Sequence, residues 1–213
     1  MPGTPVFCEV ATPVGVARTV SQTPSGSVGG LLVLGHGAGG GIEAPDLLAA
    51  RDAGLAAGLR VIRVEQPWRV RGRRIAEAPA RLDLAWLAVL EQCRRDGPLI
   101  LGGRSAGARV ACRTATALGA DAVLALAFPL HPLAGGVSRW AELRGPAVPR
   151  LVVQGERDAF GVPAQEPGVQ VYVVTGADHA FAVRRKDGRT PEQVATDIRE
   201  AVRGWLVGLQ TLT

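Results

Sequence analysis

An apolar segment that reads as a buried strand, residues 98–102, runs directly into a helical stretch through the motif GRSAG at residues 103–107. A tight strand-to-helix turn of this kind pushes the side chain at its apex, here Ser105, out above the sheet. The turn is so crowded that only glycine-sized residues fit two positions before and two positions after the apex, and these are Gly103 and Gly107. The motif could arise by chance in a chain with 28 glycines, but the flanking strand and helix favour a nucleophilic serine.

An acid and a base that could activate Ser105 follow it in the chain, in the order that a serine at such a turn requires. Asp158 comes shortly after the apolar run at residues 151–153, and His179 comes shortly after the segment VQVYVV at residues 169–174. The carboxyl ends of parallel strands lie along one edge of a sheet, so all three side chains should emerge on the same side. We therefore predict a catalytic triad of Ser105, Asp158 and His179.

The choice of base rests on elimination, because the chain has only 3 histidines. His36 precedes the serine and His131 precedes the acid, so neither has the required place in the order. His179 is the histidine that remains.

A glycine-rich loop, GHGAGG at residues 35–40, follows another apolar run at residues 31–34. Its glycines leave backbone N–H groups unshielded. Acyl transfer needs such donors, because the tetrahedral intermediate places negative charge on the former carbonyl oxygen. We predict an oxyanion hole formed by the N–H groups of Ala106 and Ala38, with Gly39 as the alternative to Ala38.

Four segments carry a resemblance to a known family: His36-Gly37 after a strand, the GRSAG turn, GERD at residues 155–158 and DHAF at residues 178–181. In this combination, which spans residues 31 to 181, the chain resembles the α/β-hydrolase superfamily. It is most similar to small, lidless, dienelactone-hydrolase-like members, including the hydrolase-like domain of a subunit of a chromatin acetyltransferase complex. Two departures from the turn of these relatives, Ala106 where Met is common and Ala108 where Gly is common, remove no backbone donor.

The resemblance implies a serine hydrolase of the α/β-hydrolase fold that cleaves a small carboxylic ester or thioester through an acyl-enzyme on Ser105. Dienelactone hydrolases use a cysteine nucleophile, so the serine argues against that particular substrate. The resemblance also leaves a second hypothesis open, an interaction module with the hydrolase fold and no turnover. It implies neither a metal nor an organic cofactor.

The glycine-rich loop at residues 35–40 also fits GxGxxG, the pattern that binds the pyrophosphate of a dinucleotide. Glu65, at the end of the next apolar run, could then be the acid that binds a ribose. This alternative leaves Ser105, Asp158 and His179 as three unrelated coincidences at strand ends. We therefore rank it below the hydrolase.

Length and composition indicate one domain over residues 1–213, long enough to bury roughly 70 % of the surface that its unfolded chain exposes. Apolar residues make up 47 % of the chain and charged residues 20 %, which argues against extensive disorder. The amino end lacks a secretory pattern, and the longest apolar run, residues 122–130, is far below the ~20 residues of a membrane helix. Cys8, Cys93 and Cys112 lack metal-ligand spacing and read as reduced thiols, so we predict a cytoplasmic protein.

Apolar runs alternate with helical patterns along the chain, which predicts a mostly parallel sheet covered by helices on both faces. The expected helices cover residues 45–58, 80–95 and 105–118 and a segment from residue 191 onward, and the later expected strands cover residues 59–64, 122–128, 150–154 and 169–174. Segments 7–10 and 14–20 are expected to form an antiparallel hairpin at the edge. Thr190 and Gln193 fit a capping box at the start of the last helix.

Only a short stretch, residues 129–149, lies where many hydrolases insert a helical lid, so we expect an open site. His131 and Trp140 lie in this stretch, and Trp68 leaves a strand end on the same edge. These three side chains are candidates for the wall of a substrate pocket. An equally strong alternative is that they pack the loops against the sheet.

The formal net charge is +5, and a single lysine, Lys186, accompanies the arginines. Two basic clusters, within residues 69–74 and 184–189, leave the sheet at its expected catalytic edge. They form either a solvated surface or a rim that attracts an anionic ester, with Arg74 or Arg184 pairing with the anion. Aromatic residues, at 4 %, are too sparse to stack bases, so nucleic acid is not an expected partner. The oligomeric state stays open.

Overall fold

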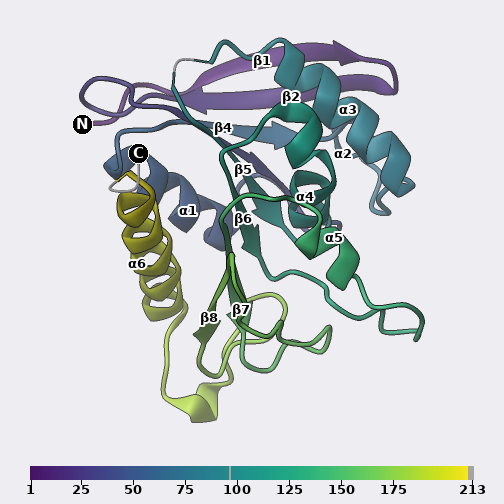
Figure 1. Ribbon diagram of the computed structural model, residues 1–213, viewed down its shortest axis with the longest axis vertical. Helices are drawn as coiled ribbons and strands as arrows, with labels where there is room; N and C mark the ends of the chain where they lie inside the picture. The colour runs from purple at the N-terminus through teal and green to yellow at the C-terminus, as the bar shows by residue number, and fades with distance from the viewer. Residues whose placement is uncertain (96, 211–213) are drawn as a thin grey trace.

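The computed structural model describes residues 1–95 and 97–210. Their eight strands form one sheet in the order β1-β2-β4-β3-β5-β6-β7-β8 (Figure 1). The strands are β1 (Val6–Thr12), β2 (Gly15–Gln22), β3 (Leu31–Gly35), β4 (Arg60–Glu65), β5 (Leu99–Arg104), β6 (Ala122–Leu126), β7 (Arg150–Gly155) and β8 (Val169–Val174). The helices are α1 (Pro45–Ala56), α2 (Pro67–Val70), α3 (Pro79–Glu91), α4 (Ala106–Leu118), α5 (Trp140–Arg144) and α6 (Pro191–Gln210), with a 3₁₀ turn, η1, at Arg185–Asp187.

Strands β3 to β8 pair in parallel with their neighbours, and β2 runs antiparallel to both β1 and β4. The predicted hairpin near the amino end is thus confirmed, and β1 forms one edge of the sheet. Strand β8 forms the other edge.

Helices cover both faces of the sheet, as the apolar strands predict. Figure 1 shows α1 and α6 on one side and α2 to α5 on the other. In strand β3, Leu31 and Val33 belong to the core on the side of α3 and α4, whereas Leu32 and Leu34 belong to the core on the side of α1 and α6. Side chains alternate between the two faces of a strand, so a continuously apolar strand needs a core on each side. The predicted α/β architecture is confirmed.

Several element boundaries differ from the predicted ones. The strand expected at residues 122–128 ends at Leu126, because Ala127 has φ 47° and leaves the extended conformation. The helix expected at residues 80–95 ends at Glu91, beyond which the chain tightens into a turn. The capping box at the start of α6 is confirmed by hydrogen bonds from Thr190 N–H to Gln193 Oε1 (2.9 Å) and from Gln193 N–H to Thr190 Oγ1 (3.3 Å).

The order of strands brings two loops together at the carboxyl edge of the sheet. Strand β3 lies between β4 and β5, so the chain leaves it toward one side and later returns on the other. Gly35 at the end of β3 is in register with Gly103 near the end of β5. A reversal of this kind opens a crevice outside the strand ends, which is where ligands bind in open α/β sheets. The loop after β3 and the turn after β5 therefore meet at the predicted site.

Candidate active site

Ser105 occupies a strained turn between β5 and α4. Its φ of 51° and ψ of −108° lie outside the regions that residues other than glycine normally adopt, at a cost of about 1–3 kcal/mol. The surrounding structure holds this conformation: Ser105 N–H donates to Leu126 O (2.9 Å), and Arg109 N–H donates to Ser105 O (3.1 Å). The conformation places a half-buried serine hydroxyl above the sheet, as the motif predicts.

The two glycines of the motif are required by close backbone contacts. A Cβ on Gly103 would lie 2.5 Å from the carbonyl oxygen of Gly35, closer than any real Cβ approaches an oxygen. A Cβ on Gly107 would collide with the same carbonyl group. The end of β3 thus presses against both sides of the turn. This contact fixes the loop after β3 beside Ser105.

The structure brings Ser105, Asp158 and His179 together at this edge. Nδ1 of His179 lies 2.8 Å from Oδ2 of Asp158, and Nε2 of His179 lies 3.1 Å from Oγ of Ser105. The carboxylate can only accept, so the network assigns the proton to Nδ1 and leaves Nε2 free to accept the serine proton. The Asp158 side chain is fully buried, and the imidazole is 24 % exposed. This is the geometry of a serine activated by a base whose orientation a buried acid controls.

The acid and the base are each held by further contacts. Phe160 N–H donates to Oδ1 of Asp158 (2.8 Å), and the Phe160 ring packs on the His179 imidazole with ring centres 4.3 Å apart. Asp178 shapes the loop that carries the base, since its Oδ1 accepts from the N–H groups of Ala180 (2.8 Å) and Ala182 (3.0 Å). The imidazole thus has both its position and its ring plane set by its surroundings.

The loop after β3 offers backbone donors beside the serine. Across the described residues, the N–H groups of Ala38, Gly39 and Ala106 donate to no other group. Gly37 lies against the turn, since a Cβ on it would be 3.3 Å from Cβ of Ser105. These donors are the ones that the sequence predicts for an oxyanion hole. Their role in binding an oxyanion stays a prediction.

His36 anchors this loop in the interior. Its Nε2 accepts from Gln66 N–H (3.0 Å), so the ring proton lies on Nδ1, which donates to Gly37 O (2.9 Å). Burial lowers the pKa of His36, and the positive charge of Arg69 lowers it further, against the hydrogen bond to Gly37. The imidazole is therefore a neutral structural bridge between the ends of β3 and β4.

The candidate pocket residues differ in how deeply they are buried. Trp68 is 2 % exposed and packs on His36 in the core, so the prediction that it lines an open pocket is wrong. The turn of α2 directs the indole inward, where it lines a cavity of only about 10 Å³ that Ala106 also lines. His131 is exposed, and its backbone N–H donates to Phe160 O (2.8 Å), which ties its loop to the loop of the acid.

Trp140, at the start of α5, is half buried and lies under the Arg144 guanidinium at 4.5 Å from its ring centre. Helix α5 is the only helix in the fully described segment 129–149, so no lid of helices covers the site. Arg74 is exposed and, within the described residues, has no ion-pair partner. A role in substrate binding stays a prediction for Trp140, Arg74 and His131.

Most of the clustered arginines are engaged by carboxylates. Glu77 pairs with Arg71 (2.7 Å) and with Arg73 (3.6 Å). Arg184 pairs with Asp187 (3.0 Å), so it is less available to an anionic substrate than the sequence suggests. The cluster members that form no ion pair within the described ranges are Arg69, Arg74, Arg185 and Lys186.

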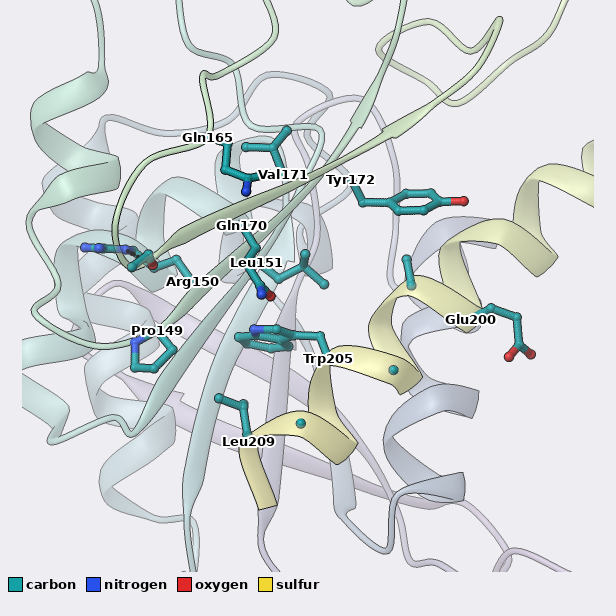
Figure 2. Close-up of a pocket in the computed structure, with 14 residues that line it drawn as sticks. Pro149, Arg150, Leu151, Gln165, Gln170, Val171, Tyr172, Glu200, Trp205 and Leu209 are labelled. Atoms are coloured by element: carbon teal, nitrogen blue, oxygen red, sulfur yellow. Dashed lines mark hydrogen bonds between the residues drawn. The ribbon is translucent and has the colours of Figure 1, made fainter. Parts of the chain in front are cut away.

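A pocket of about 680 Å³ lies away from the serine, between the amino end of β7, strand β8 and the last turns of α6. Figure 2 shows the Trp205 indole beside Leu151, with Tyr172 and Leu209 on the flanks. None of Ser105, Asp158 and His179 lines this pocket. Among the described residues, no group of three or more His, Cys, Asp or Glu side chains is placed to hold a metal ion, and no helix is long and apolar enough to cross a membrane.

Comparison with known proteins shows the family to which the chain belongs. The family described as "Alpha/beta hydrolase domain" matches residues 29–207. The chain therefore belongs to the α/β hydrolase family and is not the Rossmann protein of the alternative hypothesis. No curated protein matches the sequence.

Solved structures share the fold at low sequence identity. A serine hydrolase without a lid from Xanthomonas campestris is 21 % identical, with 96 % of each chain covered and a TM-score of 0.71. Est1E from Butyrivibrio proteoclasticus is 13 % identical, with 96 % of this chain and 99 % of that chain covered and a TM-score of 0.73. A dienelactone hydrolase from Anabaena variabilis is 15 % identical, with coverage of 93 % and 95 % and a TM-score of 0.68.

Four side chains of the site were not singled out by the sequence analysis: Gln154, Phe160, Arg104 and Asp46. Gln154 donates to Asp158, and Arg104 donates to the backbone of His179. The first three lie within a few positions of Asp158 or Ser105, and this proximity in sequence was the signal that could have identified them. Asp46, at the start of α1, offered none, because its contact is with a residue far away in the chain.

Proposed function

We propose that this protein is a serine hydrolase that cleaves a small carboxylic ester or thioester through an acyl-enzyme on Ser105. The observation that carries the proposal is the continuous contact from the Asp158 carboxylate through His179 to the Ser105 hydroxyl, with distances of 2.8 and 3.1 Å. The strained turn at Ser105 supports it, because strained backbone conformations cluster at active sites.

In the first half-reaction Ser105 Oγ attacks the carbonyl carbon while its proton passes to Nε2 of His179. The oxyanion accepts hydrogen bonds from the N–H groups of Ala106 and Ala38, with Gly39 as the alternative donor. The intermediate collapses, and the leaving alcohol or thiol takes the proton from His179. In the second half-reaction His179 removes a proton from water, the resulting hydroxide attacks the acyl carbon, and Ser105 regains its proton.

Asp158 has no proton to give in this scheme. It holds the His179 tautomer with the proton on Nδ1 and stabilises the imidazolium that forms in each half-reaction. The chemistry is completed by protein groups and water, without a metal or an organic cofactor.

An anionic ester is the substrate class that we favour. Arg69 and Arg74 emerge after β4 at the catalytic edge and form no ion pair within the part of the chain that the structure describes. The electrostatic effect of Arg69 on His36 supports a position close to the loop at residues 35–40. Unpaired cations at a protein surface raise the local concentration of anionic ligands.

A fluorophosphonate probe tests the proposal without knowledge of the substrate. The native protein should be labelled on Ser105, and the heat-denatured protein and the Ser105→Ala variant should not. A panel of nitrophenyl esters of rising chain length then measures the acyl preference. A native protein that resists the probe while Ser105 is accessible would contradict the proposal.

Such resistance would favour the second candidate, a hydrolase-fold interaction module without turnover. The resemblance of the GRSAG turn to the hydrolase-like domain of a chromatin acetyltransferase complex subunit motivates this candidate. The contacts among Ser105, His179 and Asp158 argue against it, because an interaction module has no need of them.

A further inference from the structure

Arg104 is a buried cation next to the proposed nucleophile, and the reaction scheme above does not use its side chain. It is the last residue of β5 and is 9 % exposed. Burying a guanidinium is costly unless it is paired and hydrogen-bonded. The contacts that it makes therefore indicate why it is there.

The counter-ion of Arg104 is Asp46, in the first turn of α1. Nε of Arg104 lies 3.1 Å from Oδ2 of Asp46, and the two side chains are 10 % and 4 % exposed. Neither atom has a hydrogen-bond partner, so the short distance reflects a Coulombic contact without hydrogen-bond alignment. Burial raises the pKa of Asp46, and the charge of Arg104 opposes that shift. Asp46 compensates the buried charge but does not fix the orientation of the guanidinium by itself.

The remaining nitrogen atoms of Arg104 face the two loops that complete the site. Nη2 donates to the backbone carbonyl oxygen of His179 at 3.0 Å. Nη1 lies against the loop after β3, at 3.1 Å from the position of a Cβ on Gly37 and 3.8 Å from that of a Cβ on Gly40. One planar group thus donates to the segment that carries the base and lies beside the segment that carries the predicted oxyanion donors.

We propose that Arg104 is a positioning residue that holds the His179 loop and the loop at residues 35–40 in place around Ser105, with Asp46 as its counter-ion. The inference rests on the proposed function. A pair of apolar side chains of similar size could replace a buried ion pair at little cost in stability. Such a pair could not donate to the carbonyl of His179. Stability and positioning can therefore be separated by experiment.

The central experiment compares the wild type with the double variant Arg104→Met/Asp46→Leu. Two quantities are measured: the melting temperature, and the rate at which a fluorophosphonate labels Ser105. We expect the double variant to melt close to the wild type and to be labelled roughly tenfold to hundredfold more slowly, since small misplacements of catalytic groups have effects of this size. With a nitrophenyl ester, kcat should fall and KM should change little, because the proposed role of Arg104 is to position groups that act in the transition state. A double variant that is labelled at the wild-type rate overturns the inference.

Two conservative single variants keep the inference testable if the double variant does not fold. Asp46→Asn leaves the buried guanidinium without its counter-ion, so the melting temperature should fall, but it retains the bond to the His179 carbonyl, so labelling of the folded protein should be slowed less than in Arg104→Lys. Arg104→Lys retains the positive charge beside Asp46 but lacks the planar fork that spans both loops, so labelling should be slow. The inference is contradicted if Arg104→Lys is labelled at the wild-type rate, or if folded Asp46→Asn is labelled more slowly than folded Arg104→Lys.

Arg150→Met is the matched control. Arg150 is also a buried arginine, 8 % exposed, and its side chain donates to the carbonyls of Gly168 and Arg144 at the opposite, amino end of β7. This variant should lower the melting temperature without slowing the labelling of the folded protein. If the wild type itself is not labelled, the proposed function fails and the inference fails with it. If the wild type is labelled and the Arg104 variants match it, only the inference fails.

Discussion

Nε2 of Gln154 lies 2.7 Å from Oδ2 of Asp158, the carboxylate oxygen that also accepts the Nδ1–H of His179. Gln154 is fully buried near the end of β7, and its amide also donates to Phe128 O (3.0 Å) and Gly161 O (2.9 Å). Two amide hydrogens therefore serve three acceptors. The acid of the site is tied to the ends of β6 and β7 through this one side chain.

Replacing Gln154 by Met should lower both stability and turnover. The buried partners of the amide lose their hydrogen bonds, which costs about 1–3 kcal/mol for each group left unsatisfied. Asp158 also loses a donor that fixes its orientation toward His179, so kcat should fall by roughly tenfold or more. Thermal unfolding and ester hydrolysis measure the two effects. The same change at Gln170, which is exposed on β8, is the control and should alter neither. A Gln154→Met variant with full activity would show that the hydrogen bond to Asp158 is dispensable.

The three residues of the proposed triad should act as a unit. Ser105→Ala and His179→Ala should each lower turnover by roughly 10⁶-fold, and the double variant should be little worse than either. Asp158→Asn should cost up to about 10⁴-fold with the fold intact, because the main loss is control of the His179 tautomer. Additive losses in kcat/KM would contradict the assignment. Equal damage from His131→Ala would show that the wrong histidine was chosen.

His36 should make the protein sensitive to mild acid. Burial lowers its pKa below 6.5. As the pH falls through this value, His36 is therefore protonated in the unfolded chain before it is protonated in the native protein. The stability that follows from this difference is present above pH ~6.5 and is lost as the pH falls below that value, by at most about 1.4 kcal/mol per pH unit. We expect the free energy of unfolding to decline between about pH 7 and pH 5. His36→Gln should be less stable at neutral pH and should lack this part of the decline. Parallel pH profiles for the two proteins would exclude the explanation.

If the substrate is anionic, its kcat/KM should depend on ionic strength. For an ester with a remote carboxylate, kcat/KM should fall as the ionic strength rises from ~0.01 M to ~0.15 M, over which the Debye length shrinks from ~30 Å to ~8 Å. A neutral ester of the same size should barely respond. Arg74→Gln should weaken the response to salt, whereas Arg203→Gln, on the exposed face of α6, should not. Equal responses for the two esters would leave the arginines as ordinary surface charge.

Much of the fold could be predicted because its signals are local. Strand β8 matches the predicted residues 169–174, since a short run rich in β-branched and aromatic residues has few other interpretations. The capping box at Thr190 is a contact between residues three positions apart. The ends of β6 at Leu126 and of α3 at Glu91 were not predicted. The end of a strand or helix depends on local backbone conformation and on tertiary contacts, and the pattern of apolar residues reports neither.

The sequence by itself determined where the reactive groups had to lie. A serine between two glycines at a strand-to-helix turn, followed by an acid and a histidine after later strands, limits those groups to one edge of a parallel sheet. The sequence also determined that His179 is the only histidine with the required place in the chain. These are matters of order and spacing, which are properties of the chain before it folds.

Only the tertiary structure decided what supports those groups. Arg104 meets the backbone of His179, 75 positions away, and its counter-ion Asp46 belongs to a helix on another part of the chain. Trp68 follows β4 at the expected edge of the sheet, but the conformation of α2 directs its side chain into the core. Contacts between side chains far apart in sequence depend on which strands become neighbours and on how the helices pack against them. These contacts are defined only when the chain has folded and the strands and helices have taken their places.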